Sequence, residues 1–167
     1  AAFAALQAIE NGYQAALMAP TEILTEQHYR KLSALLEPLG VNVVWLTGSM
    51  KSKEKLKYKQ IVTEGTAQLV IGTHALFQED VVFKKLGLAI IDEQHRFGVE
   101  QRLALRMKGA SVGEPHQLMM TATPIPRTLS MSYYADLDVS VIDELPPGRT
   151  PIVTRLIADA RRDEVAL

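Results

Sequence analysis

Two adjacent acids, Asp92 and Glu93, are the residues of this 167-residue chain best suited to chemistry. They follow four apolar residues, 88–91, which predict a buried strand. Mg²⁺ keeps several waters and needs few protein carboxylates, so we interpret Asp92 as a magnesium ligand acting through a water molecule. Glu93 would then orient or deprotonate a water that attacks a phosphate. The competing interpretation is a capped strand end with solvated acids.

Two hydroxyls form a second candidate cluster. Thr121 and Thr123 flank one alanine at the end of another predicted strand, 117–120. In an extended segment both hydroxyls point the same way. We expect them to bond a neighbouring loop such as the one that holds His95, which would link the hydrolytic site to a second surface. Alternatively, the threonines are satisfied by their own backbone.

The elements that must position these residues are predicted by short apolar runs that alternate with helical segments. That alternation predicts an α/β fold, with a parallel sheet flanked by helices. The predicted strands are 15–19, 41–46, 68–71, 88–91, 117–120 and 139–142. The predicted helices are 1–9, 23–36, 52–62, 99–107 and 125–134.

Three of these segments carry further detail. The helix at 23–36 is predicted to place on one face Leu24, His28, Leu32, Leu35 and Leu36. Ser52 is the expected N-cap of the next helix, in which Lys55 and Lys59 share a face and most lysines are solvated. Trp45 is expected in the core, although its place at a strand end leaves room for a surface role.

Ligands of open parallel sheets bind beyond the carboxyl ends of the strands. Polar residues directly after the strands should therefore gather along one edge and form a single working surface. Besides the acids and the threonines, they are the segments 20–22 and 72–74, and the turn at 47–49 closes a further strand.

Composition sets limits on the function. The net charge of −1 gives no indication of a nucleic-acid partner, so any such partner must be argued from local features. The absence of cysteine excludes disulfides and thiolate metal sites, and it is compatible with the cytoplasm. No apolar run approaches the roughly 20 residues that span a bilayer. The four histidines lack the paired spacing of a metal motif.

Four strings in the sequence resemble, in order, the helicase motifs of the RecG family. They are MAPTEIL (18–24), GTHALFQ (72–78), DEQHRFG (92–98) and TATPIPRTL (121–129). A fifth string, IDELPPGRTP (142–151), resembles the junction between the two motor lobes of that family. Together the strings span nearly the whole chain.

The resemblance implies a superfamily 2 DNA motor with a two-lobed, RecA-like engine of the P-loop NTPase type. Residues 1–144 would form the first lobe, and residues 145–167 the linker and the start of the second. The implied activity is ATP hydrolysis with Mg²⁺, coupled to fork regression and branch migration of Holliday junctions in recombination and repair. Branched DNA is the implied partner, with a single-stranded-DNA-binding protein as a further one, for a cytoplasmic monomer.

Site residues follow from the same resemblance. Asp92 would be the Mg²⁺ acid and Glu93 the hydrolytic carboxylate, while Gln94 and His95 would couple that motif to movement. Thr121 and Thr123 would relay the nucleotide state to the DNA side. The residues that would lie along the DNA backbone are Pro20, Thr21, Gly48, Gly72, Thr73 and His74.

One departure from the family concerns the phosphate-binding loop. None of the ten glycines is followed by lysine, so no G-x-x-x-x-G-K-[ST] motif is present. In the family this loop lies just before a helix like the one predicted at 1–9, and we expect further sequence on both sides. We therefore expect the chain alone neither to hydrolyse ATP nor to unwind DNA. Steady ATP turnover by the purified chain would contradict this expectation.

Two alternatives remain open. The transcription-repair coupling factor shares the string TATPIPRT, but its acid motif usually has Glu where this chain has Gln94. A non-catalytic DNA-binding or interaction module with a RecA-like fold comes from a different class. An RNA helicase is disfavoured because the D-E-A-D tetrad is absent.

Overall fold

The computed structural model describes residues 1–93, 96–97, 108, 113–123, 138–144, 148–150, 154 and 156. The chain divides into two compact units, Ala1–Pro124 and Ile125–Leu167. All the helices and strands given below belong to the first unit. No helix among the described residues is long and apolar enough to cross a membrane.

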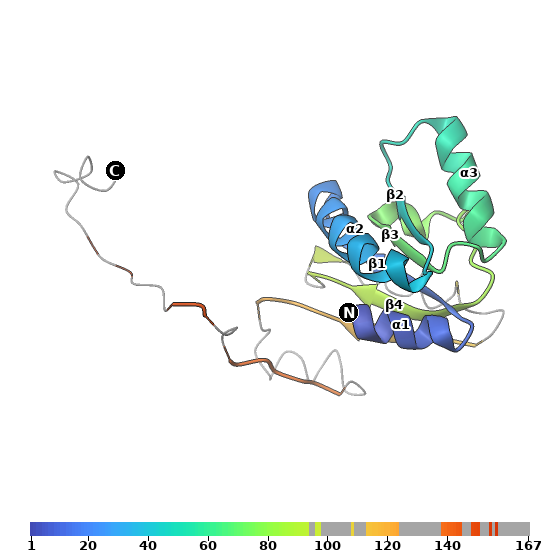
Figure 1. Ribbon diagram of the computed structural model, residues 1–167. Helices are drawn as coiled ribbons and strands as arrows, with labels where there is room; N and C mark the ends of the chain where they lie inside the picture. The colour runs from blue at the N-terminus through green and yellow to red at the C-terminus, as the bar shows by residue number, and fades with distance from the viewer. Residues whose placement is uncertain are drawn as a thin grey trace. The chain divides into compact units, whose positions relative to one another are not determined.

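A five-stranded parallel sheet forms the centre of the first unit, in the order β2-β3-β1-β4-β5 (Figure 1). The strands are β1 Gln14–Met18, β2 Val43–Leu46, β3 Leu69–Gly72, β4 Leu86–Ile91 and β5 His116–Met119. The helices are α1 Ala2–Glu10, α2 Glu22–Leu36 and α3 Ser52–Thr63, with 3-10 turns η1 Glu37–Leu39 and η2 His74–Phe77. These bounds confirm the predicted α/β class, five of the six predicted strands and the first three predicted helices.

The sheet is buried on both faces by two separate apolar clusters. Along β1, Ala16 and Met18 join the cluster that contains Val62 of α3. The alternate residues of β1 face α1 and α2, in a cluster that contains Ile9 and Leu36. Because helices cover both faces, β1 and β3 are buried at every position and do not alternate between buried and exposed residues.

Helix α2 is the helix most important for the site. Identifiable residues determine where it begins and ends. Thr21 is the N-cap, and its Oγ1 accepts a hydrogen bond from the backbone N–H of Leu24 at 3.3 Å. The chain leaves the helix through η1 and turns at Gly40, whose φ is 82°. Leu32 and Leu36 are buried as predicted, but Leu35 is 55% exposed, so its predicted place on the buried face is wrong. The buried stripe turns through Thr25 and Leu32 to Leu36, and Leu35 lies outside it.

Two further predictions are wrong. Lys51 is the N-cap of α3 and has the extended backbone of a cap, whereas Ser52 is already helical and no side chain caps the helix. The predicted strand at 139–142 is absent, since residues 138–143 have no regular structure and Ile142 is 92% exposed. Its short apolar pattern reports only β propensity, and a strand is stable only when it pairs with a neighbour. The predicted helices at 99–107 and 125–134 lie outside the described residues.

A buried glutamine holds the amino ends of the strands together. Gln14 is 3% exposed, and its Nε2 donates to the carbonyls of Val62 at 2.9 Å and Ala67 at 2.7 Å. Its Oε1 accepts from the backbone N–H of Lys85 at 3.0 Å. One side chain thus satisfies backbone groups from the end of α3 and from the segments that enter β3 and β4.

Replacing this glutamine should destabilise the fold. In Gln14→Leu the side-chain volume is nearly kept but the buried backbone groups lose their partners, so we expect a loss of about 2–4 kcal/mol. Thermal melting of the protein measures the loss. Gln7→Leu, at an exposed position of α1, is the matched control and should change stability by less than about 0.5 kcal/mol. Equal melting temperatures for the two variants would contradict this account of Gln14.

Candidate functional site

The strand register brings the carboxyl ends of three strands into line. Met18 pairs with Gly72 on one side and with Ile91 on the other. The backbone N–H of Asp92 donates to the carbonyl of Met18 at 2.8 Å, and that of Ala19 donates to the carbonyl of Gly72 at 3.2 Å. The segments that follow β1, β3 and β4 therefore leave the sheet side by side, as the sequence predicted. We call this side the carboxyl edge.

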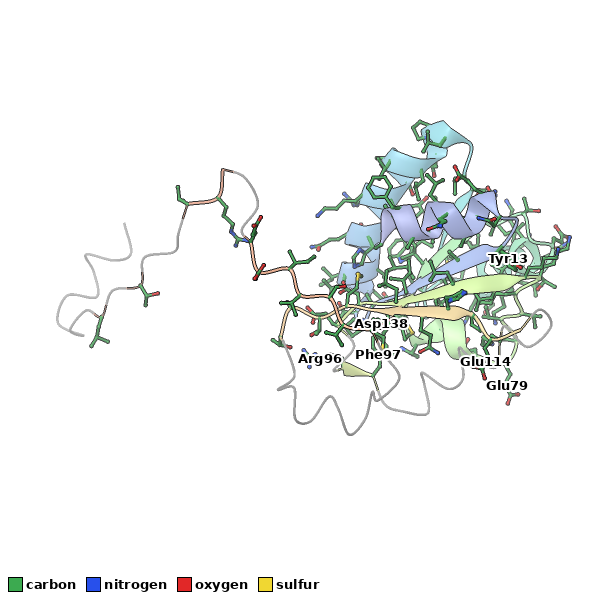
Figure 2. The ribbon with its side chains drawn as sticks, turned by 90° about the horizontal axis from the view of Figure 1, so that it is seen from below. Tyr13, Glu79, Arg96, Phe97, Glu114 and Asp138 are labelled. Carbon is green, nitrogen blue, oxygen red and sulfur yellow. The ribbon has the colours of Figure 1, made fainter. Side chains whose placement is uncertain are left out.

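Figure 2 shows the two ends of the sheet. Arg96 and Phe97, which follow β4, lie at the carboxyl edge, and Phe97 is buried. Tyr13 and Glu114, which precede β1 and β5, lie at the opposite end.

The carboxylate of Asp92 is held from two directions. Its Oδ1 accepts a hydrogen bond from the backbone N–H of Glu93 at 2.9 Å. Its Oδ2 lies 2.7 Å from Nε2 of His28, which reaches across from α2. The Asp92 side chain remains 21% exposed, so part of the carboxylate faces solvent. His28 was predicted to share one helix face with four leucines, but no sequence pattern indicated this partner.

Glu93 has an unusual backbone. Its φ is 52°, which makes it the one described non-glycine residue in the left-handed region. That conformation costs a side-chain-bearing residue of order 1–3 kcal/mol and is found preferentially at functional sites. The turn is closed by the N–H of Arg96, which donates to the Glu93 carbonyl at 2.9 Å. Gln94 and His95, the other two residues predicted for this motif, lie outside the described residues.

The donor set around Asp92 suits Mg²⁺ better than a cage-bound metal. No three His, Cys, Asp or Glu side chains gather into a metal site in the part of the chain that the structure describes. A carboxylate has about four lone-pair positions, and two of those on Asp92 are engaged by His28 and Glu93. A partly exposed acid with spare lone pairs fits an ion held mainly by water and nucleotide phosphates.

The two threonines at the end of β5 lie next to each other. Their Oγ1 atoms are 3.2 Å apart, and the backbone N–H of Thr123 donates to Oγ1 of Thr121 at 3.2 Å. Both of these contacts lie within the threonine pair itself. The expected bond to the loop of His95 stays a prediction, because that residue is outside the described part of the chain.

Glu22 connects two segments that the sequence predicted to lie along DNA, 20–22 and the turn at 47–49. Its Oε2 accepts from the hydroxyl of Ser49 at 2.9 Å, and its Oε1 accepts from the Ser49 backbone N–H at 3.3 Å. The Ser49 hydroxyl also lies 3.0 Å from that of Thr47. The turn that contains Gly48 is thus fastened to the start of α2, beside Pro20 and Thr21.

The loop after β3 is tightly packed. A Cβ added to Gly72 would lie 2.4 Å from the carbonyl oxygen of Leu46, so only glycine fits there. Thr73 is 3% exposed, and its hydroxyl has no hydrogen-bond partner among the described residues. His74 is exposed. A contact between the Thr73 hydroxyl and a phosphate, as predicted from the sequence, would need this loop to move.

Trp45 contacts α2 as well. Its Nε1 donates to Oγ1 of Thr25 at 2.9 Å, and its ring stacks on Tyr29 with centroids 5.9 Å apart. Trp45 is half-buried, which lies between the core and surface roles that the sequence left open. Glu22, Thr25 and His28 therefore all use one side of α2 to contact elements of the carboxyl edge.

Two lysines of α3 have partners in the loop before β4. Lys55 Nζ donates to Oε1 of Gln78 at 2.8 Å, and Lys59 pairs with Asp80. The hydrogen bond from Lys59 lowers the pKa of the Asp80 carboxyl. Lys108 donates to the carbonyls of Gln78 and Val81 at 2.7 Å, and burial lowers the pKa of its ammonium. The predicted shared face of Lys55 and Lys59 is confirmed, and both lysines on this face bind the loop before β4.

Comparison with known proteins assigns the chain to a family. The sequence model of the DEAD/DEAH box helicases matches residues 1–132. The chain belongs to the DEAD/DEAH box helicase family. The five-stranded sheet with its flanking helices is accordingly a RecA-like helicase lobe, as the sequence predicted.

Individual helicases resemble the chain over its whole length. It is 59% identical to the ATP-dependent DNA helicase RecG of Haemophilus influenzae, over 100% of this chain and 24% of that protein. It is 59% identical to RecG of Escherichia coli K12, over 99% of the chain and 24% of that protein. A solved RecG bound to a three-way DNA junction superposes with a TM-score of 0.80 at 46% identity, over 98% of this chain and 21% of that one. The chain thus spans about a quarter of the length of these helicases.

The packing at the carboxyl edge can be tested with two glycines. Gly72→Ala should destabilise the protein by about 1–3 kcal/mol, because the new methyl group meets the backbone oxygen of Leu46 and pushes β2 from β3. Gly48→Ala is the matched control, since an added Cβ meets nothing within 4 Å and stability should hardly change. Thermal melting compares the two variants, and an unchanged Gly72→Ala variant would refute the close approach.

Proposed function

We propose that the protein containing this chain is an ATP-dependent DNA helicase that remodels branched DNA, namely stalled forks and Holliday junctions, in recombination and repair. The observation that carries the proposal is the acid pair Asp92-Glu93 at the carboxyl edge, beside the loops that follow β1 and β3. A pair of hydrolytic acids on the same edge as loops that can contact the DNA backbone is an arrangement that suits a nucleic-acid motor.

We propose a separate role for each member of the acid pair. Asp92 would hold Mg²⁺ through a water molecule, and the ion, when bound, neutralises charge on the nucleotide phosphates. The Glu93 carboxylate would orient the attacking water and accept its proton. The left-handed backbone at Glu93 sets the direction in which this side chain leaves the main chain. Gln94 and His95, together with Thr121 and Thr123, would couple hydrolysis to movement.

Branched DNA is the proposed substrate because of the likeness to RecG. The relatives described above are RecG helicases, and one of them was solved on a three-way junction. They favour this function over the transcription-repair coupling alternative. The residues proposed to follow the DNA backbone are Pro20, Thr21, Gly48, Gly72, Thr73 and His74, through hydroxyl and amide donors. Such contacts position the duplex without reading its sequence.

The wider setting is proposed on the same basis. Residues 1–144 would form the first helicase lobe, and residues 145–167 the linker and the start of the second. The whole protein would act as a cytoplasmic monomer with ATP and Mg²⁺, and a single-stranded-DNA-binding protein would be a further partner.

Substitution of the hydrolytic acid tests the proposal. In the full-length protein we expect ATP turnover that forked DNA stimulates, and Glu93→Gln should lower it by about 100-fold or more because the base is lost. Binding of a fluorescent ATP analogue should persist in the variant. Glu10→Gln, an exposed acid at the end of α1, is the control and should keep wild-type turnover. Absence of turnover by the wild-type protein on any DNA would rule out the motor.

A further inference from the structure

The contact between His28 and Asp92 joins residues that are 64 positions apart in the chain. Nε2 of His28 lies 2.7 Å from Oδ2 of Asp92, which is the distance of a strong, charge-assisted hydrogen bond. The His28 side chain is 26% exposed, so it lies at the margin of the core instead of filling it. Apolar packing therefore does not account for a histidine here.

Asp92 extends this contact into a hydrogen-bond network that includes Glu93. Oδ2 of Asp92 receives His28, and Oδ1 receives the backbone N–H of Glu93 at 2.9 Å. With one donor on each oxygen, the plane of the carboxylate is fixed. The same bond from Glu93 supports the left-handed turn at φ 52° from which the Glu93 side chain starts. His28 thus influences the orientation of both acids.

Helix α2 gives His28 a firm base. One turn before it, Thr25 is fully buried, accepts the bond from Trp45 and donates to the carbonyl of Glu22 at 2.8 Å. One turn after it, Leu32 is buried in the cluster beneath the sheet. The backbone of His28 therefore has little freedom, and the imidazole is presented to Asp92 in a prepared position.

We propose that His28 is a positioning residue that holds Asp92 in the orientation required for Mg²⁺. The inference rests on the function proposed above and names a part of the site that the sequence motifs do not include. His28 needs only an N–H on Nε2 for this role, so a neutral imidazole serves. Removing a side chain that orients a metal-binding group typically lowers metal affinity about 10- to 100-fold.

Three substitutions in the full-length protein separate the possibilities. His28→Leu removes the donor while keeping a side chain that α2 accepts. His28→Gln keeps an N–H donor at nearly the same distance from the backbone. Gln27→Leu is the matched control, because Gln27 is the neighbouring residue of α2 and is exposed.

The measurement is the binding of a fluorescent, non-hydrolysable ATP analogue with saturating Mg²⁺ and with EDTA. The dissociation constant in EDTA divided by the dissociation constant in Mg²⁺ measures how much the metal contributes to nucleotide binding. This ratio does not depend on turnover. We expect His28→Leu to reduce that ratio about 10-fold or more, with little change of affinity in EDTA. His28→Gln should recover most of the ratio, and Gln27→Leu should match the wild type. A purely structural role would weaken binding equally under both conditions.

The outcomes distinguish this inference from the proposed function. Equal ratios for His28→Leu and Gln27→Leu, in a protein whose ATP turnover responds to forked DNA, would overturn the role of His28 alone. Failure of His28→Gln to recover any of the ratio would also contradict the hydrogen-bond role. Absence of both Mg²⁺-dependent nucleotide binding and turnover in the wild type would overturn the proposed function, and this inference with it.

Discussion

The parallel pairing of β1 with β3 and β4 is the constraint on which the site depends. Every residue of β1 is buried, and residues 15–18 are paired with a neighbouring strand on both sides. A parallel register places the ends of neighbouring strands at the same level, so Asp92 and Thr73 emerge next to the Pro20 loop. A shift of one residue would exchange the two faces of a strand and break both apolar clusters. Burial of the sheet therefore fixes the relative positions of the polar segments.

Helix α2 connects those segments a second time. Along one side of the helix, Glu22 binds the turn at Ser49, Thr25 binds Trp45, and His28 binds Asp92. Each bond joins α2 to a different part of the carboxyl edge. Because the helix is itself anchored in the core, the proposed DNA loops and the proposed metal acid share one rigid support.

Much of the fold could be predicted from the sequence, because apolar runs of a buried parallel sheet are distinct and end at polar residues. The acid pair could be predicted for the same reason. The bond from His28 could not, since no local pattern specifies which side chain from a distant helix meets Asp92. Two of the wrong predictions share one cause. Ser52 has a residue type that favours a helix N-cap, and the segment 139–142 has residue types that favour a strand. A cap also needs an extended backbone, and a strand needs a neighbouring strand to pair with. The local sequence specifies neither of these conditions.

The central claim is that one edge of the sheet meets both nucleotide and DNA. Hydrogen–deuterium exchange of the full-length protein, with forked DNA and with a Mg²⁺-bound ATP analogue, tests it most directly. We expect slower amide exchange in segments 19–22, 47–49 and 72–74 when DNA is added, and in segment 92–93 when nucleotide is added. Protection confined to the opposite end of the sheet, around Tyr13 and Glu114, would contradict it.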